Sequence, residues 1–215
     1  MVEMPEGFCI DATEVTRTQY DEWLSTSPST SGQPSACSWN DSYMPACEWP
    51  PGAEGDLPVV CVDWCDALAY CSGVGKRLCG KIGGGANALE DHADATKSQW
   101  YAACSSGGTQ VYPYGDVFSE SACNGYDSGP GRTVPVASLA GCQSAVSGYQ
   151  GVFDLSGNVW EWEDSCSGNA GATDRCRARG ADFAGGVSNL RCDHDTDRDR
   201  DRQNDDLGFR CCSSP

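Results

Sequence analysis

The stretch Phe153–Trp162 concentrates groups that could do chemistry. It holds two carboxylates and an amide, from Asp154, Glu161 and Asn158, among apolar and aromatic residues that favour burial. Buried carboxylates need partners, and a bound hard cation would satisfy them because such an ion binds carboxylate and backbone carbonyl oxygens together. The alternative is a tryptophan-rich core turn whose polar groups are satisfied by other protein groups. Both interpretations require elements that hold this turn closed.

Fifteen cysteines are the strongest compositional signal of the 215-residue chain. Cysteine at this density is typical of proteins that form disulfides outside the cytosol. Zinc knuckles would need paired C-x-x-C motifs, and the nearest spacing is the single pair Cys61 and Cys65. Only two histidines, His92 and His194, are present. Because the cysteine count is odd, at least one thiol is free or pairs with another chain.

Charge and length narrow the class of protein. The net charge of −17 would be repelled by nucleic acid and by anionic membranes, whereas it suits divalent cations or basic partners. The 26 glycines and 11 prolines indicate a turn-rich globular chain, which we treat as one domain over residues 1–215. No run of apolar residues reaches transmembrane length. We expect an exported protein whose signal was removed or lies upstream.

The positioning elements can be read from periodicity and caps. Thr16 and Gln19 form a capping box, which predicts a helix through Leu24, and Asp63 caps a second helix. A third, short helix is expected over 98–104, and loop over 25–58. Beyond residue 108 the sequence is typical of a loop-rich β region. The expected strands are 2–10, 59–62, 133–139, 177–183 and 207–212.

These residues also stand as an ordered set of motifs. They include Glu14-Val15-Thr16, Val62-x-Trp64, Gly75-Lys76-Arg77-Leu78, Tyr112-Pro113-Tyr114-Gly115, Gly157-Asn158-Val159-Trp160-Glu161-Trp162 and Gly208-Phe209-Arg210-Cys211. From about Val2 to Cys212 the chain resembles the formylglycine-generating enzyme, or sulfatase-modifying factor, domain family. The resemblance implies a single α+β domain with a C-type-lectin-like topology, rich in loops and stabilised by several disulfides.

The resemblance also implies where catalytic groups should be. The family's oxidase converts a sulfatase cysteine to formylglycine with a copper ion held by two cysteines, which follow a Gly-Gly-Ser-Phe stretch. The equivalent stretch here is Gly180-Ala181-Asp182-Phe183, and the two thiol positions are Gly185 and Leu190. A second branch of the family uses a histidine triad for iron, which two histidines cannot supply. We therefore expect neither copper nor iron.

Disulfides and structural calcium complete the expected scaffold. The resemblance implies the pairs Cys71–Cys211 and Cys104–Cys192. Spacing suggests Cys37–Cys47, Cys123–Cys142, Cys166–Cys176, Cys65–Cys79 and Cys9–Cys212, which leaves Cys61 as a buried thiol. By family position, one calcium ion would use the Asp154 and Glu161 side chains with the Gly157 and Val159 carbonyls. A second would use Asn124, Gly125 and Asp127, for which a simple turn is the alternative.

The charged segment 193–206 has two interpretations. It is either a solvated loop with screened ion pairs or part of a recognition surface, because loops on a rigid frame carry binding residues. In the family, the loops before the closing Gly-Phe-Arg strand line the open face, and retroelement-diversified relatives vary this segment. The predicted ligand surface comprises Asp182, Asn189, Asp193, His194, Asp195, Asp197, Arg198, Arg200 and Arg202.

Two functions remain after this reading. We favour an exported, non-catalytic ligand-binding or structural domain, stabilised by calcium and disulfides, with a protein or glycan ligand. The alternative is an oxidase of the formylglycine-generating type. The absence of cysteine at Gly185 and Leu190 favours the first.

Overall fold

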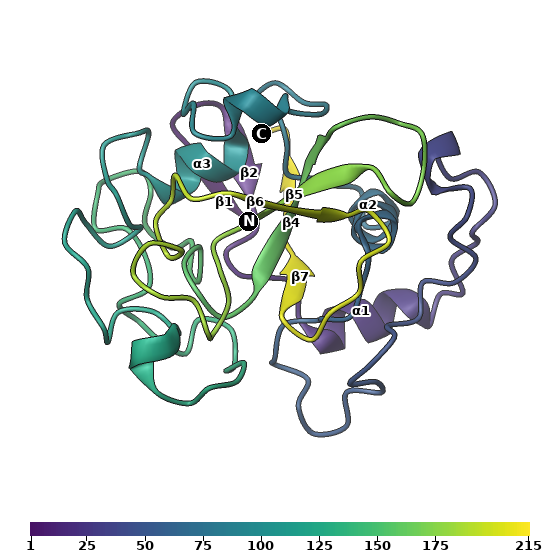
Figure 1. Ribbon diagram of the computed structural model, residues 1–215, viewed down its shortest axis with the longest axis horizontal. Helices are drawn as coiled ribbons and strands as arrows, with labels where there is room; N and C mark the ends of the chain where they lie inside the picture. The colour runs from purple at the N-terminus through teal and green to yellow at the C-terminus, as the bar shows by residue number, and fades with distance from the viewer.

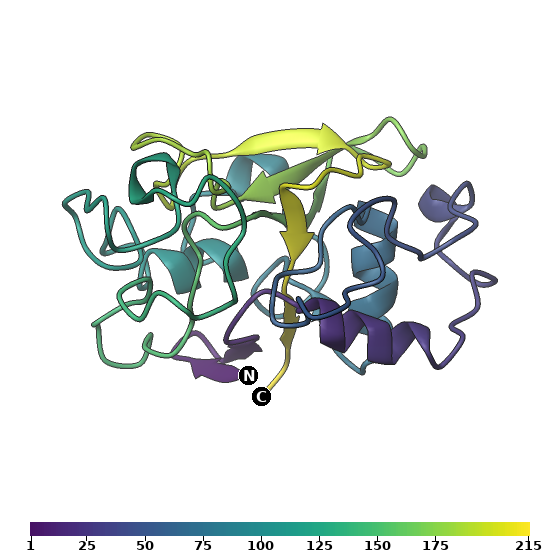
Figure 2. The same ribbon diagram turned by 90° about the horizontal axis from the view of Figure 1, so that it is seen from below.

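Two small sheets and three helices are embedded in loops. The computed structural model describes residues 1–215. The first sheet has the order β1-β2-β8-β3, with β1 Val2–Met4, β2 Phe8–Ile10, β3 Arg77–Leu78 and β8 Cys211–Ser213. The second has the order β6-β5-β4-β7, with β4 Trp160–Cys166, β5 Arg175–Arg179, β6 Thr196–Asp199 and β7 Leu207–Phe209. Figure 1 shows both sheets, and Figure 2 shows the two chain ends side by side.

The helices follow the caps read from the sequence. Helix α1 covers Arg17–Leu24 and begins at the Thr16–Gln19 capping box. Helix α2 covers Trp64–Gly73, and α3 covers Gln99–Cys104 behind an N-cap at Ser98. Single 3-10 turns lie at η1 Ser35–Cys37, η2 Leu89–Asp91 and η3 Tyr126–Ser128. None of the helices has the length and apolar character needed to cross a bilayer.

Two expected strands are absent, and another is shifted. The segments 59–62 and 133–139 form no strand. Residues 59–62 are buried, but Cys61 has a φ of 61°, a left-handed backbone conformation that no strand accommodates. The expected strand 177–183 begins and ends earlier, as β5. The closing strand is divided into β7, which runs parallel to β4, and β8, which joins the first sheet.

Seven disulfides cross-link the chain, and four are the expected ones: Cys71–Cys211, Cys104–Cys192, Cys123–Cys142 and Cys166–Cys176. The pairs Cys37–Cys47, Cys65–Cys79 and Cys9–Cys212 were wrong. The structure instead contains Cys37–Cys65, Cys47–Cys61 and Cys79–Cys212, so that Cys61 is bonded and Cys9 is free.

Strand register explains two of these corrections. Ile10 is opposite Cys212 across the β2–β8 pair, and Cys9 is opposite Ser213. Successive side chains point to opposite faces of a strand, so Cys9 faces away from Cys212. Arg77 of β3 is opposite Cys212, and Cys79, two residues later, projects from the same face as Arg77, so it bonds to Cys212 diagonally.

Part of the charged segment 193–206 forms a strand, β6, and the rest of the segment remains turn and loop. Strand β6 pairs with β5 over four residue positions, with Asp197 opposite Arg177 and Asp199 opposite Arg175. Asp and Arg alternate along β6, and alternation places the two types on opposite faces. Asp197 and Asp199, on one face, both pair with Arg175 of β5, while Arg198 on the other face approaches the ring of Trp160.

Candidate functional site

The two family thiol positions are closed by carbon and backbone. At Gly185, a Cβ atom would lie 2.7 Å from the Ala181 Cβ and 3.0 Å from the Asp182 carbonyl oxygen. Leu190 is buried, and its Cδ1 lies 2.7 Å from the position that a Cβ would take on Gly125. A side chain at Gly185 therefore collides with its own loop. Both positions are buried, and they present only glycine and aliphatic carbon.

The Phe153–Trp162 turn is held by close backbone packing. Gly157 has a φ of 78°, and a Cβ on it would lie 2.2 Å from the Asn124 carbonyl oxygen. The Asn158 amide hydrogen donates to that same carbonyl at 2.8 Å, and the Asn158 side chain donates to Glu14 Oε1 at 2.9 Å. Glycine is required at 157 because no other residue avoids this contact. The turn thus joins residues that are distant in sequence.

Glu161 already has a cationic partner. The Arg210 guanidinium donates from Nη2 to Glu161 Oε1 and from Nε to Oε2, both at 2.7 Å. The Trp100 indole also donates to Oε2, at 2.9 Å. Both carboxylate oxygens are therefore committed to protein donors, and this arrangement supports the tryptophan-rich core turn that was the alternative to an ion at Glu161.

Glu14 and Asp154 lie in the same buried cluster but lack a cation of their own. Glu14 Oε2 has no hydrogen-bond partner, while Asp154 Oδ2 accepts only from the Ala137 amide, at 2.6 Å. Burial raises the pKa of Asp154 to about 6, and burial followed by repulsion from Asp154 raises the pKa of Glu14 well above its usual range. The raised pKa values of Glu14 and Asp154 reflect two buried carboxyls without a cation of their own, whereas Glu161 is neutralised by Arg210.

The second expected calcium turn is satisfied by protein groups. The Asn124 side chain donates to the Arg132 carbonyl at 3.0 Å and to Asn158 Oδ1 at 3.1 Å. The Gly125 carbonyl accepts from the Ser128 hydroxyl at 2.7 Å, while Asp127 is exposed. These are the contacts of a closed turn. No group of three or more His, Cys, Asp or Glu side chains is arranged to hold a metal.

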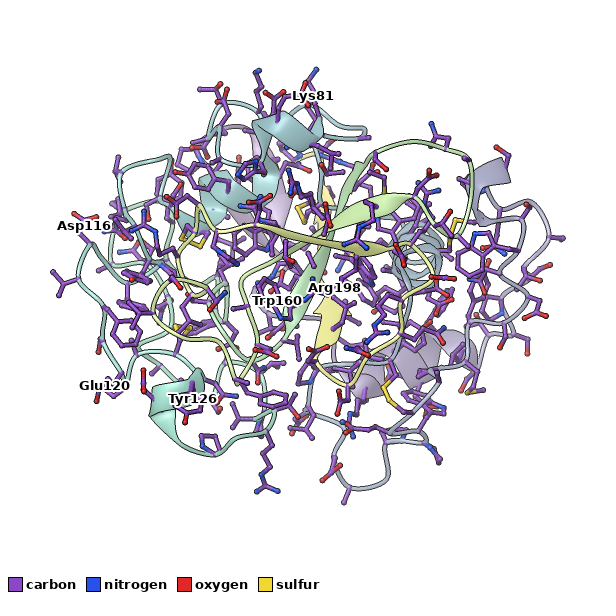
Figure 3. The ribbon with its side chains drawn as sticks, in the orientation of Figure 1. Lys81, Asp116, Glu120, Tyr126, Trp160 and Arg198 are labelled. Atoms are coloured by element: carbon purple, nitrogen blue, oxygen red, sulfur yellow. A yellow bond between two sulfur atoms is a disulfide. The ribbon has the colours of Figure 1, made fainter.

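The predicted ligand residues divide into two groups. His194 and Arg198 lie against the buried Trp160, with ring centroids 5.9 Å apart for His194 and the Arg198 guanidinium 5.6 Å from the ring; Asn189 and Asp182 join this group through His194 and Asp206. The Asn189 amide contacts His194 Nε2 at 3.2 Å. Figure 3 shows Trp160 and Arg198 together at the centre of the molecule. Burial and the neighbouring Asp206 raise the pKa of Asp182 to about 6.

The second group is engaged within the fold. Arg200 is buried, 5.0 Å above the Trp64 ring, and donates to Asp174 at 2.8 Å, so its assignment to the ligand surface was wrong. Asp195 and Asp197 pair with Arg177 and Arg175. Asp193 pairs with Arg191 at 2.6 Å. Arg202 belongs to neither group, because its side chain is exposed.

Sequence reasoning missed the buried ionic cluster around the Phe153–Trp162 turn. Glu14 and Arg210 were read as parts of motifs, although they meet Asp154 and Glu161 in space. The available signal was an unusual number of charged residues within otherwise apolar segments, such as Arg210 beside Phe209. Long-range pairing of charges cannot be read from a single sequence.

The chain is similar in sequence to known proteins of the formylglycine-generating type. The chain is 34% identical over 170 residues to the inactive C-alpha-formylglycine-generating enzyme 2 of Mus musculus, covering 74% of this chain and 50% of the mouse protein. It is 32% identical over 138 residues to the formylglycine-generating enzyme of Thermomonospora curvata, covering 56% of this chain and 38% of the relative. The chain therefore spans half or less of the length of these curated relatives.

Solved structures share the fold. The structure of PvdO from Pseudomonas aeruginosa matches with a TM-score of 0.66 at 21% identity, covering 97% of this chain and 80% of that one. Treponema denticola variable protein 1 matches with a TM-score of 0.60 at 21% identity, covering 97% and 84%. The α+β, C-type-lectin-like fold is thereby confirmed. The model of the sulfatase-modifying factor enzyme 1-like domain matches residues 1–215, and the chain belongs to this family.

Proposed function

We propose that this chain is a non-catalytic ligand-binding or structural domain on the formylglycine-generating enzyme scaffold. The observation that carries the proposal is the closed floor at Gly185 and Leu190. Copper binding and mixed-disulfide formation in the family need two thiolates. Neither position carries sulfur here, and Gly185 also has no room for a cysteine side chain. The similarity to a relative named as inactive supports the same conclusion.

The ligand surface is best drawn around Trp160. Asp182, Asn189, His194 and Arg198 offer a carboxyl, an amide, an imidazole and a guanidinium near one aromatic ring. Such a mixture suits hydrogen bonding to a protein or glycan ligand, while the net charge of −17 disfavours nucleic acid. A retroelement-diversified segment at 193–206 would suit the same role, and the chain shares its fold with Treponema denticola variable protein 1.

Calcium and export are parts of the same proposal. Asp154 and Glu14 would hold a calcium ion, which would supply the positive charge that this carboxylate pair lacks. Seven disulfides suit an oxidising compartment, such as the cell surface, the periplasm or the extracellular space. Both features stabilise the scaffold without taking part in chemistry.

The deciding experiment compares two readouts. The protein is incubated with copper and a peptide carrying the sulfatase Cys-x-Pro-x-Arg motif, and aldehyde is measured by mass spectrometry. We expect none; aldehyde would establish the oxidase alternative and overturn the proposal. In parallel, glycan and protein arrays are screened with the natural chain and with Arg198→Ala, which should lose a specific ligand bound beside Trp160.

A further inference from the structure

Several large apolar side chains are exposed to solvent on one side of the molecule. Val117 is 81% exposed, Tyr126 is 73% exposed and Val187 is 47% exposed. Tyr114 and Phe118, both half-buried, accompany them. We call these five residues the aromatic edge. Exposed apolar residues that cluster are typical of interaction sites, whereas scattered ones need no explanation.

Contacts between the segments hold the aromatic edge together. The Tyr112 ring stacks on Tyr114 with centroids 5.4 Å apart, and it lies 5.9 Å from Phe118. The Tyr112 hydroxyl donates to the Val187 carbonyl at 3.1 Å. The Tyr126 amide donates to the Gly185 carbonyl at 3.0 Å. The loop 112–118 and η3 are therefore both fixed to the loop 184–190.

The surroundings of the aromatic edge are acidic. Residues 98–131 contain no lysine, arginine or histidine, but they include Asp116, Glu120 and Asp127, all of which are exposed. The exposed Arg132, whose carbonyl accepts from the Asn124 side chain, is the nearest cation in sequence after this segment. The neighbouring Arg191 is neutralised by Asp193 at 2.6 Å. Figure 3 shows Asp116, Glu120 and Tyr126 along one side of the molecule, away from Trp160 and Arg198 at its centre.

We propose that the aromatic edge is a docking surface for a basic protein segment that carries apolar or aromatic anchors. The inference rests on the proposed binding function, but it concerns a second surface, separate from the ligand surface around Trp160. Exposed Tyr126 and Val187 offer contact area for apolar anchors, and the acidic rim attracts Lys and Arg side chains. The same rim repels nucleic acid and anionic lipid. A neutral glycan would gain nothing from these carboxylates.

The test uses a short amphipathic peptide of alternating lysine and leucine or tryptophan, with a glutamate-substituted copy as the charge control. Binding is followed by fluorescence anisotropy between about 50 and about 300 mM salt. We expect the lysine peptide alone to bind, and Kd to rise with salt. Tyr126→Ala and Val187→Ser should each raise Kd by about five- to twentyfold, and Glu120→Lys should reduce the salt dependence.

Val74→Ser is the matched control, because Val74 is 39% exposed at the end of α2 and lies outside the aromatic edge. Its Kd should equal that of the natural chain. Equal effects of Val74→Ser and Val187→Ser would mean non-specific attraction to an acidic protein and would overturn the inference. Binding that ignores salt, or no binding at all, would also overturn it. Aldehyde formation, by contrast, refutes only the non-catalytic proposal, so the two failures are distinguishable.

Discussion

Arg210 Nη2 lies 2.7 Å from Glu161 Oε1, and both side chains are buried at the centre of the molecule. This bidentate pair joins the strand β4 to the residue between β7 and β8. The pair explains how the Phe153–Trp162 turn accommodates the buried Glu161 side chain. The ion pair holds Arg210, and with it the junction of β7 and β8, against β4, and the same guanidinium also donates to the Asp11 and Phe153 carbonyls.

Removing Arg210 should therefore be costly. Arg210→Met leaves the Glu161 carboxylate buried without its cation, so the free energy of unfolding should fall by about 3–5 kcal/mol in denaturant titrations. Adding Glu161→Met to the same chain should recover part of the loss. Arg191→Met, which breaks an exposed pair with Asp193, should cost no more than about 1 kcal/mol. If Arg210→Met lowered the free energy of unfolding as little as Arg191→Met does, the buried ion pair with Glu161 would not stabilise the fold as proposed.

Chelation should lower the melting temperature, and calcium should restore it, because a cation held by Asp154 and Glu14 stabilises only the folded chain. Asp154→Asn and Glu14→Gln should each remove the response to calcium, as followed by differential scanning calorimetry. Asp127→Asn should keep it, since Asp127 is exposed. An unchanged melting curve for the natural chain would remove calcium from the scaffold altogether.

Restoring the family thiols should not restore their chemistry. Gly185→Cys should reduce the free energy of unfolding by about 1–3 kcal/mol because its Cβ meets Ala181. Leu190→Cys should cost about 2 kcal/mol through lost burial. Gly186→Cys is the control, because its Cβ position has only Asn189 Oδ1 within reach, at 4.0 Å. Copper-dependent aldehyde formation by the Gly185→Cys/Leu190→Cys chain would show that the floor is open.

Thiol counting tests the disulfide scheme. Labelling of denatured, unreduced protein should find one thiol, Cys9, and Cys9→Ser should leave none. Cys61→Ser should give two, because it releases Cys47. The same variant should lose about 3 kcal/mol of stability in the chain-entropy picture, less any strain that is relieved. More than one thiol in the natural chain would refute at least one of the seven pairs.

Asp63 gives a pH dependence with a defined sign. Burial raises its pKa to about 6, above the usual aspartate value of about 4. Between these values the unfolded state has already lost the proton that the folded state keeps, so the free energy of unfolding falls as pH rises and stays lower above about 6. Asp63→Asn keeps the N-cap of α2 and should stabilise the protein by about 1–2 kcal/mol at pH 8.

The same Asp63→Asn variant should show little effect at pH 4, where the natural carboxyl is protonated in the folded state. Asp63 and Asp41 both line a hollow with a volume of about 260 Å³. Asp41→Asn is the control, because Asp41 is exposed. Chemical denaturation at the two pH values measures both variants. Equal stabilisation at pH 4 and pH 8 would assign the effect to packing and not to charge.

The sequence predicted those features that depend on neighbouring residues. Thr16 with Gln19, and Asp63 and Ser98, cap the three helices because a cap needs only the next few amides. The close pairs Cys123–Cys142 and Cys166–Cys176 follow from short spacing. The alternation of Asp and Arg along β6 was also present in the sequence. It was read as a solvated loop because charged residues are uncommon in strands.

By itself, the sequence determined the caps, the motif order and the absence of sulfur at Gly185 and Leu190, because each is a property of one position or of near neighbours. Only the tertiary structure decided which cysteines meet, that Arg210 neutralises Glu161, and that Arg200 is buried over Trp64. These contacts join residues far apart in the chain, and strand register decides which side chains face each other. One residue of shift separates the bonded Cys212 from the free Cys9.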